Sequence, residues 1–176
     1  MKIERVFVQG AGTMGKGIAQ VTAMAGMSVT LMDLTKDITD KSLRSIEAGL
    51  QKSVDQGRMK ESEKSGALSR IRATTEVREA GEADLVIEAV FEDLEVKRAV
   101  FKKLDGVCRP EAILASNTSA LSIAAIASAT NRPEKVIGIH FMNPVPRMRG
   151  VEIIRAMTTS DETLASVKEY LQRLGK

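Results

Sequence analysis

Gln9-Gly10-Ala11-Gly12-Thr13-Met14-Gly15 is the stretch of this chain that decides the fold. The preceding residues 3–8 are rich in β-branched and aromatic side chains, which is typical of a strand, and they run directly into the glycines. From Met14 onward, apolar residues recur at helical spacing, and Gly26 is placed to end the helix. The stretch therefore predicts a strand, a tight glycine turn and a helix.

The residues that follow extend this unit and then interrupt it with a helical hairpin. Residues 28–32 read as a second strand ending on Asp33, and a strand, helix and strand in this order predict a right-handed, parallel βαβ unit. Residues 37–56 and 58–70 read as two helices folded against each other, whose polar character indicates projection into solvent or toward a ligand. The apolar residues expected toward one side of the first helix are Ile38, Leu43, Ile46, Leu50 and Val54.

Strands and helices alternate through the rest of the chain. The final helix is expected to begin at Thr159, where Thr159 and Glu162 have the spacing of a capping box. The pattern predicts an α/β fold of the Rossmann type, a doubly wound and mainly parallel sheet, in one domain over residues 1–176 with a hairpin insertion at about 37–70. The remaining strands are expected at 71–75, 84–90, 112–116, 136–140 and 151–156, and the remaining helices at 94–104 and 123–129.

Composition excludes several classes of protein. The 176 residues include 26 Lys and Arg against 23 Asp and Glu, a formal charge of +3, and only 3% are aromatic, which argues against nucleic-acid binding. The single Cys108 excludes an internal disulfide, and no Cys/His cluster suggests a metal. No apolar run is long enough to span a bilayer, and the strand at 3–8 leaves no room for a signal peptide, so we expect a cytoplasmic protein without a membrane segment.

The spacing of the three glycines predicts a dinucleotide site. Gly10 permits the tight turn, Gly12 lets the backbone approach a pyrophosphate, and Gly15 allows close packing of helix and strand, while the helix N-terminus attracts the phosphates. Asp33, eighteen residues after Gly15, is placed to accept hydrogen bonds from the adenosine ribose, which favours NAD over NADP. Lys36 keeps NADP open, and the alternative is that the glycines only shape a turn.

His140, the only histidine, ends a predicted strand, and ligands of open α/β sheets bind beyond the carboxyl ends of their strands. Glu152 lies twelve residues further on, after a loop with two prolines that we expect to reverse the chain. A carboxylate within hydrogen-bond reach of an imidazole stabilises the protonated imidazole as it forms, so the histidine can act as a general base. The alternative interpretations are that His140 is a structural histidine bonded to the backbone and that Glu152 is a surface residue of its strand.

Two further groups of polar residues are expected at the same edge. Ser116-Asn117-Thr118-Ser119 ends another strand and offers two hydroxyls and an amide to a carbonyl or alcohol oxygen, although it is equally suited to a turn or a helix cap. Glu92 and Lys97 follow the strand at 84–90. The alternative interpretation is that they belong to the exposed start of an ordinary helix.

Taken together, four motifs closely resemble the L-3-hydroxyacyl-CoA dehydrogenase family, and the bacterial 3-hydroxybutyryl-CoA dehydrogenases most of all. The resemblance covers essentially all 176 residues. It implies reversible oxidation of an (S)-3-hydroxyacyl-CoA by NAD⁺ to the 3-oxoacyl-CoA. The motifs are residues 10–19 (GAGTMGKGIA), 86–93 (VIEAVFED), 116–119 (SNTS) and 140–146 (HFMNPVP).

The resemblance also implies roles for single residues. His140 is similar to the family's catalytic base and Glu152 to the carboxylate that orients it, while Ser119 matches a hydroxyl that contacts both substrate and cofactor. The implied cofactor contacts, besides Ser119, are Gly10, Ala11, Gly12, Thr13, Met14, Gly15, Asp33, Glu92, Lys97 and Asn143, and the implied substrate contacts are Ser119 and Asn117.

Family members continue into a separate helical domain that supplies most of a dimer interface and part of the acyl site. We therefore read this chain as the dinucleotide-binding half, expect it to bind NAD but to turn over poorly by itself, and expect the whole protein to be a homodimer with an acyl-CoA substrate. Two competing hypotheses stay open. One is a related dehydrogenase that acts on a sugar acid, and the other is an NAD-binding module without catalysis.

Overall fold

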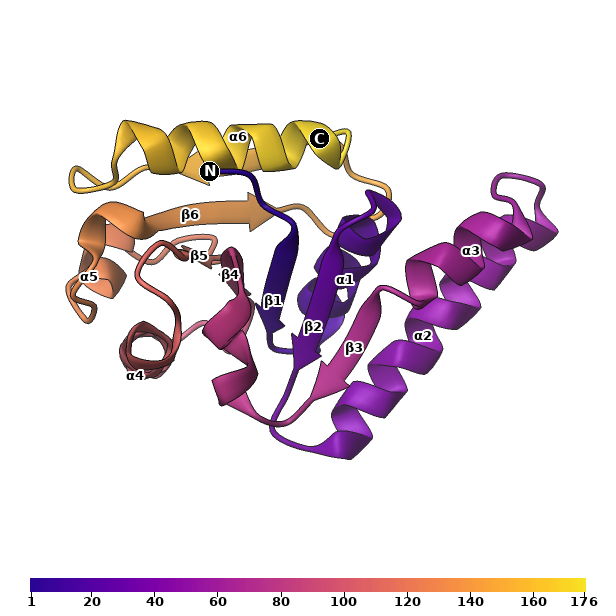
Figure 1. Ribbon diagram of the computed structural model, residues 1–176, viewed down its shortest axis with the longest axis horizontal. Helices are drawn as coiled ribbons and strands as arrows, with labels where there is room; N and C mark the ends of the chain where they lie inside the picture. The colour runs from indigo at the N-terminus through magenta and orange to yellow at the C-terminus, as the bar shows by residue number, and fades with distance from the viewer.

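One sheet of seven strands organises the molecule (Figure 1), and the computed structural model describes residues 1–176. The strand order is β3-β2-β1-β4-β5-β6-β7, in which the first six strands in the chain are parallel and β7 is antiparallel to β6. This order, which runs outward from β1 in both directions, is that of a Rossmann-type fold, as predicted. The strands are β1 (Arg5–Gln9), β2 (Ser28–Met32), β3 (Ile71–Thr74), β4 (Leu85–Glu88), β5 (Ile113–Ser116), β6 (Val136–Phe141) and β7 (Val151–Ile154).

Helices cover both faces of the sheet, which confirms the doubly wound architecture. The helices α1 (Thr13–Met24), α2 (Lys36–Asp55), α3 (Glu61–Leu68) and α6 (Asp161–Arg173) contribute to the core on one face. The other core contains side chains of the 3₁₀ helix η1 (Val77–Glu82), α4 (Leu94–Val107) and α5 (Ile123–Ala127). A short 3₁₀ turn, η2 (Pro133–Lys135), precedes β6. No helix combines the length and the apolar character needed to cross a bilayer.

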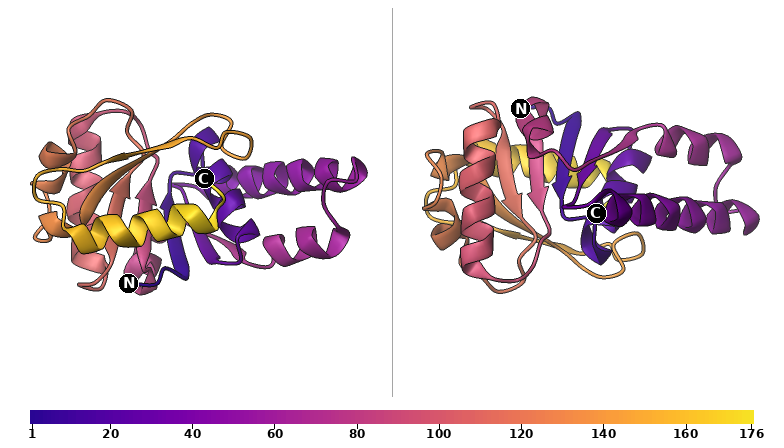
Figure 2. Two further views of the ribbon diagram at one scale, coloured as in Figure 1. Left: turned by 90° about the horizontal axis from the view of Figure 1, so that it is seen from above. Right: turned by 90° about the horizontal axis from the view of Figure 1, so that it is seen from below.

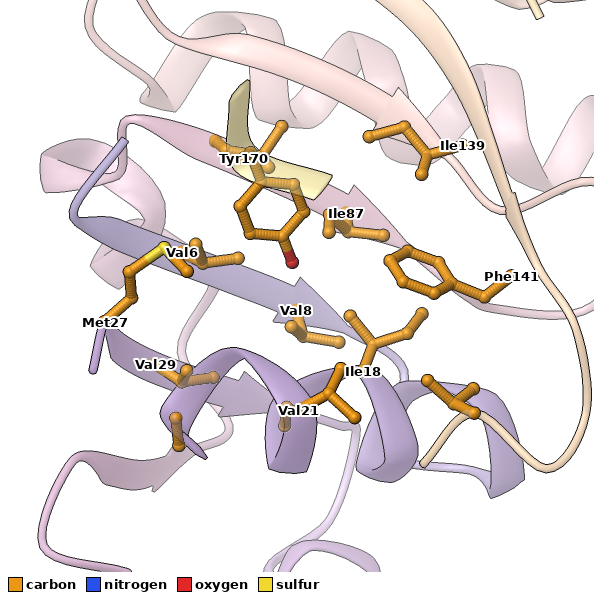
Figure 3. Close-up of a cluster of buried hydrophobic side chains, with 14 of the residues drawn as sticks. Val6, Val8, Ile18, Val21, Met27, Val29, Ile87, Ile139, Phe141 and Tyr170 are labelled. Carbon is orange, nitrogen blue, oxygen red and sulfur yellow. The ribbon is translucent and has the colours of Figure 1, made fainter. Parts of the chain in front are cut away.

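Side chains that point alternately to the two faces of the sheet fill both cores. Val6 and Val8 point toward α1 and α6, whereas Phe7 between them packs on the opposite face. In the first core, shown in Figure 3, Tyr170 of α6 reaches across the strands and its hydroxyl lies 2.7 Å from Thr22 Oγ1. The strands that carry the site are thus clamped between two apolar layers.

The hairpin of α2 and α3 extends away from the sheet, as Figure 2 shows. The expectation that Ile38 lies on the same side as Ile46 and Leu50 is wrong, because Ile38 is exposed and Thr39 is buried with them instead. The cause is a polar contact: Ser42 Oγ donates to the carbonyl oxygen of Ala11 at 2.5 Å, which sets the face that α2 turns toward the glycine loop. Ile46 and Leu50 are buried as expected.

The predicted capping box at Thr159 and Glu162 is also wrong. Ser160 is the N-cap of α6, and its hydroxyl accepts from Thr163 N at 3.1 Å. Thr159 is buried, where its Oγ1 donates to Val136 O at 2.7 Å and accepts from Ala156 N at 3.1 Å. The threonine therefore ties β6 to the segment after β7, a long-range bond that local spacing does not reveal.

Candidate active site

The carboxyl ends of the parallel strands form an edge at which the predicted polar residues meet. A cavity of about 290 Å³ opens there, between the segments that follow β4, β5 and β6. Seven of the predicted site residues line it: Met14, Glu92, Lys97, Asn117, Ser119, His140 and Asn143. Ala89, Val90, Phe141 and Met142 complete its wall.

A second cavity of about 460 Å³ lies on the other side of Ala89 and Val90, which line both. It contains the predicted Gly10, Gly12 and Asp33 and is otherwise largely apolar. Two neighbouring cavities that share a wall suit an elongated ligand with one end in each. Four predicted residues line neither of these cavities, namely Ala11, Thr13, Gly15 and Glu152.

The glycine turn has the form that a dinucleotide requires. Gly10 adopts φ +102°, and a Cβ there would lie 2.6 Å from Ala89 O. A Cβ on Gly15 would lie 1.7 Å from Gly10 O, so only glycine permits this approach of helix and turn. Gly12, in contrast, has nothing within 4 Å of its Cβ position and is exposed, and it caps α1 without a side-chain acceptor. The open helix N-terminus, with no acidic residue in its first turn, fits the pyrophosphate of NAD.

Asp33 is held rigidly at the end of β2. Its Oδ2 accepts from Ala11 N and its Oδ1 from Leu34 N, each at 2.7 Å. Ala11 thus orients the carboxylate through its backbone, a role that motif spacing did not indicate. Each carboxylate oxygen keeps acceptor capacity for a ribose hydroxyl. The nearby Lys36 pairs with Asp40 at 2.5 Å.

His140 and Glu152 are direct partners. They are paired residues in the antiparallel β6–β7 ladder, and His140 Nδ1 lies 2.9 Å from Glu152 Oε2. An ionised Glu152 keeps the hydrogen of the neutral imidazole on Nδ1 and leaves Nε2 as an acceptor. The loop with two prolines does reverse the chain as predicted. Glu152 is well exposed, yet it is a paired carboxylate and not an isolated surface residue.

Glu92 forms hydrogen bonds with residues that follow β5. It accepts from Thr118 Oγ1 and from Ser119 N at 3.0 Å, and it lies 3.3 Å from Lys97 Nζ. Desolvation raises the pKa of Glu92, but the hydrogen bond from Thr118, the charge of Lys97 and the bond from Ser119 outweigh it and bring the pKa below its ordinary value. Glu92 is therefore an anionic anchor that fixes the Ser119 backbone.

The side-chain oxygen of Asn117 takes part in a hydrogen bond within the fold. Its Oδ1 accepts from Phe141 N at 2.9 Å, which links the end of β5 to the end of β6. The two amide N–H groups of Asn117, and the second lone pair of its Oδ1, are left for a ligand in this arrangement.

The sequence reasoning missed a buried ion pair beneath the site. Lys97 is 1% exposed, so it is not the ordinary exposed helix residue considered above, and its Nζ lies 2.6 Å from Oε1 of the fully buried Glu88. Glu88 also accepts from Ser116 Oγ and from Val90 N, each at 2.7 Å. Its bond to Val90 N turns the chain, so the strand predicted over 84–90 ends at Glu88. The detectable signal was a lone acid within an apolar strand, which requires a partner.

Comparisons with known proteins agree with this geometry. A family model described as the NAD-binding domain of 3-hydroxyacyl-CoA dehydrogenase matches residues 5–176. The 3-hydroxybutyryl-CoA dehydrogenase of Bradyrhizobium diazoefficiens is 47% identical over 174 residues, which are 99% of this chain and 59% of that protein. The Clostridioides difficile enzyme of the same name is 44% identical, with 98% of this chain and 61% of that protein covered.

A solved structure extends the match to three dimensions. The (S)-3-hydroxybutyryl-CoA dehydrogenase from Ralstonia eutropha superimposes with a TM-score of 0.97 at 39% identity, and the match covers 99% of this chain and 62% of that one. The chain thus spans about three fifths of the length of these relatives. Because the family model covers nearly every residue, from the first strand to the last helix, the chain belongs to the 3-hydroxyacyl-CoA dehydrogenase family and contains its NAD-binding domain.

Proposed function

We propose that the protein is an NAD-dependent dehydrogenase that interconverts (S)-3-hydroxyacyl-CoA and 3-oxoacyl-CoA, with 3-hydroxybutyryl-CoA as its substrate. The observation that carries this proposal is the His140–Glu152 pair, 2.9 Å apart, with His140 in the wall of the cavity that Ser119 and Asn143 also line. The relatives named for this activity match the chain along its whole length.

The chemistry follows from these positions. Bound NAD⁺ supplies the acceptor for a hydride. His140 Nε2 accepts the proton of the 3-hydroxyl group as the hydride leaves C3, so that a ketone forms and an imidazolium is left beside Glu152. The carboxylate stabilises that positive charge. In the reverse direction the imidazolium returns the proton to the oxygen.

Two more residues position the reacting groups in this proposal. The Ser119 hydroxyl, which donates to Glu92 Oε1 at 3.4 Å without a ligand, turns to donate to the substrate oxygen, while the Ser119 backbone N–H stays bonded to Glu92 at 3.0 Å. Asn143, in the same cavity, contacts the nicotinamide side of the cofactor, and Asn117 offers its amide N–H groups to the substrate.

Turnover of acetoacetyl-CoA by the whole protein, followed as NADH absorbance, tests the proposal. Replacing the base in His140→Gln is expected to lower kcat by about 10²- to 10⁴-fold while NADH still binds. Glu152→Gln is expected to lower kcat by about 10- to 100-fold, because a charge-assisted hydrogen bond is lost. The matched control is Glu169→Gln on the exposed side of α6, which should retain full activity.

The competing hypotheses predict other results in the same assay. A sugar-acid dehydrogenase would reduce a 3-oxo sugar acid and leave acetoacetyl-CoA untouched. A non-catalytic module would bind NADH without turnover, and His140→Gln would change nothing. Either result would overturn the proposal.

The proposal extends to the assembly of the whole protein. By its resemblance to the family, the protein is a homodimer joined through a helical domain, and residues 1–176 alone bind NADH but turn over acetoacetyl-CoA poorly. Light scattering of the whole protein and NADH fluorescence of the 176-residue chain test these two statements.

A further inference from the structure

Gln9 is a buried polar residue without a polar partner. It is the last residue of β1, the residue is 8% exposed, and its Oε1 forms no hydrogen bond. Leaving a buried carbonyl unpaired destabilises a folded chain, and nearly all such groups in proteins are paired. A residue that violates this rule at the edge of a cavity points to a ligand.

The position of Gln9 identifies which ligand. It shares the cavity of about 460 Å³ with Gly10 and Asp33, and the remaining wall is apolar, with Leu34 and Phe91 more than four-fifths exposed. A flat heterocycle attached to a ribose suits this combination of one carboxylate, one amide and apolar side chains. Under the proposed function, on which this inference rests, Asp33 binds the adenosine ribose, so the adenosine half of NAD fills this cavity.

We propose that the side-chain amide of Gln9 hydrogen-bonds the adenosine half of the cofactor and so determines specificity for it. The terminal torsion of a glutamine is broad, and rotation about it turns either end of the amide toward the cavity. Binding then gives the buried carbonyl group the partner that it lacks in the free chain. The unpaired carbonyl of Gln9 lowers the stability of the unliganded protein. Because the cofactor gives this carbonyl a partner, the cofactor is bound more tightly.

Gln9→Met tests this, since methionine has nearly the same length but no amide. We expect its affinity for ADP, measured by calorimetry on the 176-residue chain, to fall about three- to tenfold. The thermal midpoint of the ligand-free chain should rise by about 2–4 °C, because an unpaired polar group has been removed. A purely structural role for Gln9 would lower that midpoint. The matched control is Gln20→Met in α1, which lines neither cavity and should leave ADP binding unchanged.

A second probe distinguishes the two groups of ADP that the Gln9 amide can bind, the 6-amino group of adenine and a ribose hydroxyl. Purine riboside 5′-diphosphate differs from ADP only by the missing 6-amino group. If that loss weakens binding to the original chain but not to Gln9→Met, the amide binds the amino group; if it weakens both equally, the amide binds a ribose hydroxyl. Unchanged ADP affinity in Gln9→Met would overturn the inference alone. Failure of the original chain to bind ADP and NADH would overturn the proposed function and the inference with it.

Discussion

The environment of Lys97 is set by the end of β4 and the residues that directly follow it. Its ammonium group contacts Glu88 of β4, the backbone of Val90 and Glu92, and almost none of the side chain reaches solvent. A buried charge is tolerated only when it is paired and hydrogen-bonded. Lys97 therefore supports the site from beneath, because it holds the segment that separates the two cavities.

We predict that Lys97→Met lowers the free energy of unfolding by about 3–5 kcal/mol, because Glu88 is left as an uncompensated buried charge. The double variant with Glu88→Gln should recover most of this loss, since a neutral amide can still accept from Val90 N. Urea denaturation measures both. Lys103→Met on the exposed side of α4 is the matched control. A double variant no more stable than Lys97→Met would contradict the prediction.

The single cysteine gives a second prediction at this scale. Burial raises the pKa of the Cys108 thiol to about 11, with Arg132 opposing and Asp105 adding to the shift. The thiolate is the reactive form, so native Cys108 should react with a disulfide reagent at pH 8 far more slowly than in urea. Absorbance of the released thiol measures both rates. Rapid stoichiometric labelling of the native chain would disprove the prediction.

At the scale of elements, two helical glycines differ in what surrounds them. Gly17 of α1 faces the loop between β6 and β7, and a Cβ there would lie 2.8 Å from Val145 Cβ. Gly49 of α2 is exposed, and its nearest neighbour would be Gln20 Oε1 at 3.9 Å. The first glycine permits close packing, whereas the second only weakens its helix.

Gly17→Ala is therefore predicted to destabilise the chain by about 1–3 kcal/mol through overpacking against the loop. Gly49→Ala should stabilise it by about 0.5–1 kcal/mol, because alanine is the better helix former. Each is the control for the other in urea unfolding followed by circular dichroism. The same sign for both changes would refute the packing argument.

At the scale of the whole molecule, stability should fall in acid. Desolvation raises the pKa of Asp105, but the backbone N–H of Asn131 and the guanidinium of Arg132 lower it more, so the net pKa lies below its ordinary 3.8. Glu92 is likewise lowered from 4.5. A carboxyl group with a lowered pKa in the folded state binds protons more readily when unfolded, so its contribution is complete above the ordinary pKa and is lost as the pH falls through the lowered one.

Urea denaturation between about pH 2 and 7 is predicted to show constant stability above about pH 5 and a decline below it. Asp105→Asn should lower stability at pH 7 and flatten the decline. Glu47→Gln, an exposed carboxylate without an ion pair, should leave the pH dependence unchanged. A decline as steep in Asp105→Asn as in the original chain would show that other groups cause it.

The order of elements, the parallel sheet, the glycine turn and the edge that carries the site were determined by the sequence alone, because each depends on local periodicity or on a residue type that only one backbone geometry accommodates. Tertiary structure decided what depends on which groups the fold brings together: the burial of Lys97 against Glu88, the bond from Thr159 to Val136, the bond from Ser42 to Ala11 and the unpaired Oε1 of Gln9. A buried polar group takes its partner from whichever segment the fold brings within hydrogen-bond distance, and that distance is not encoded in the spacing along the chain.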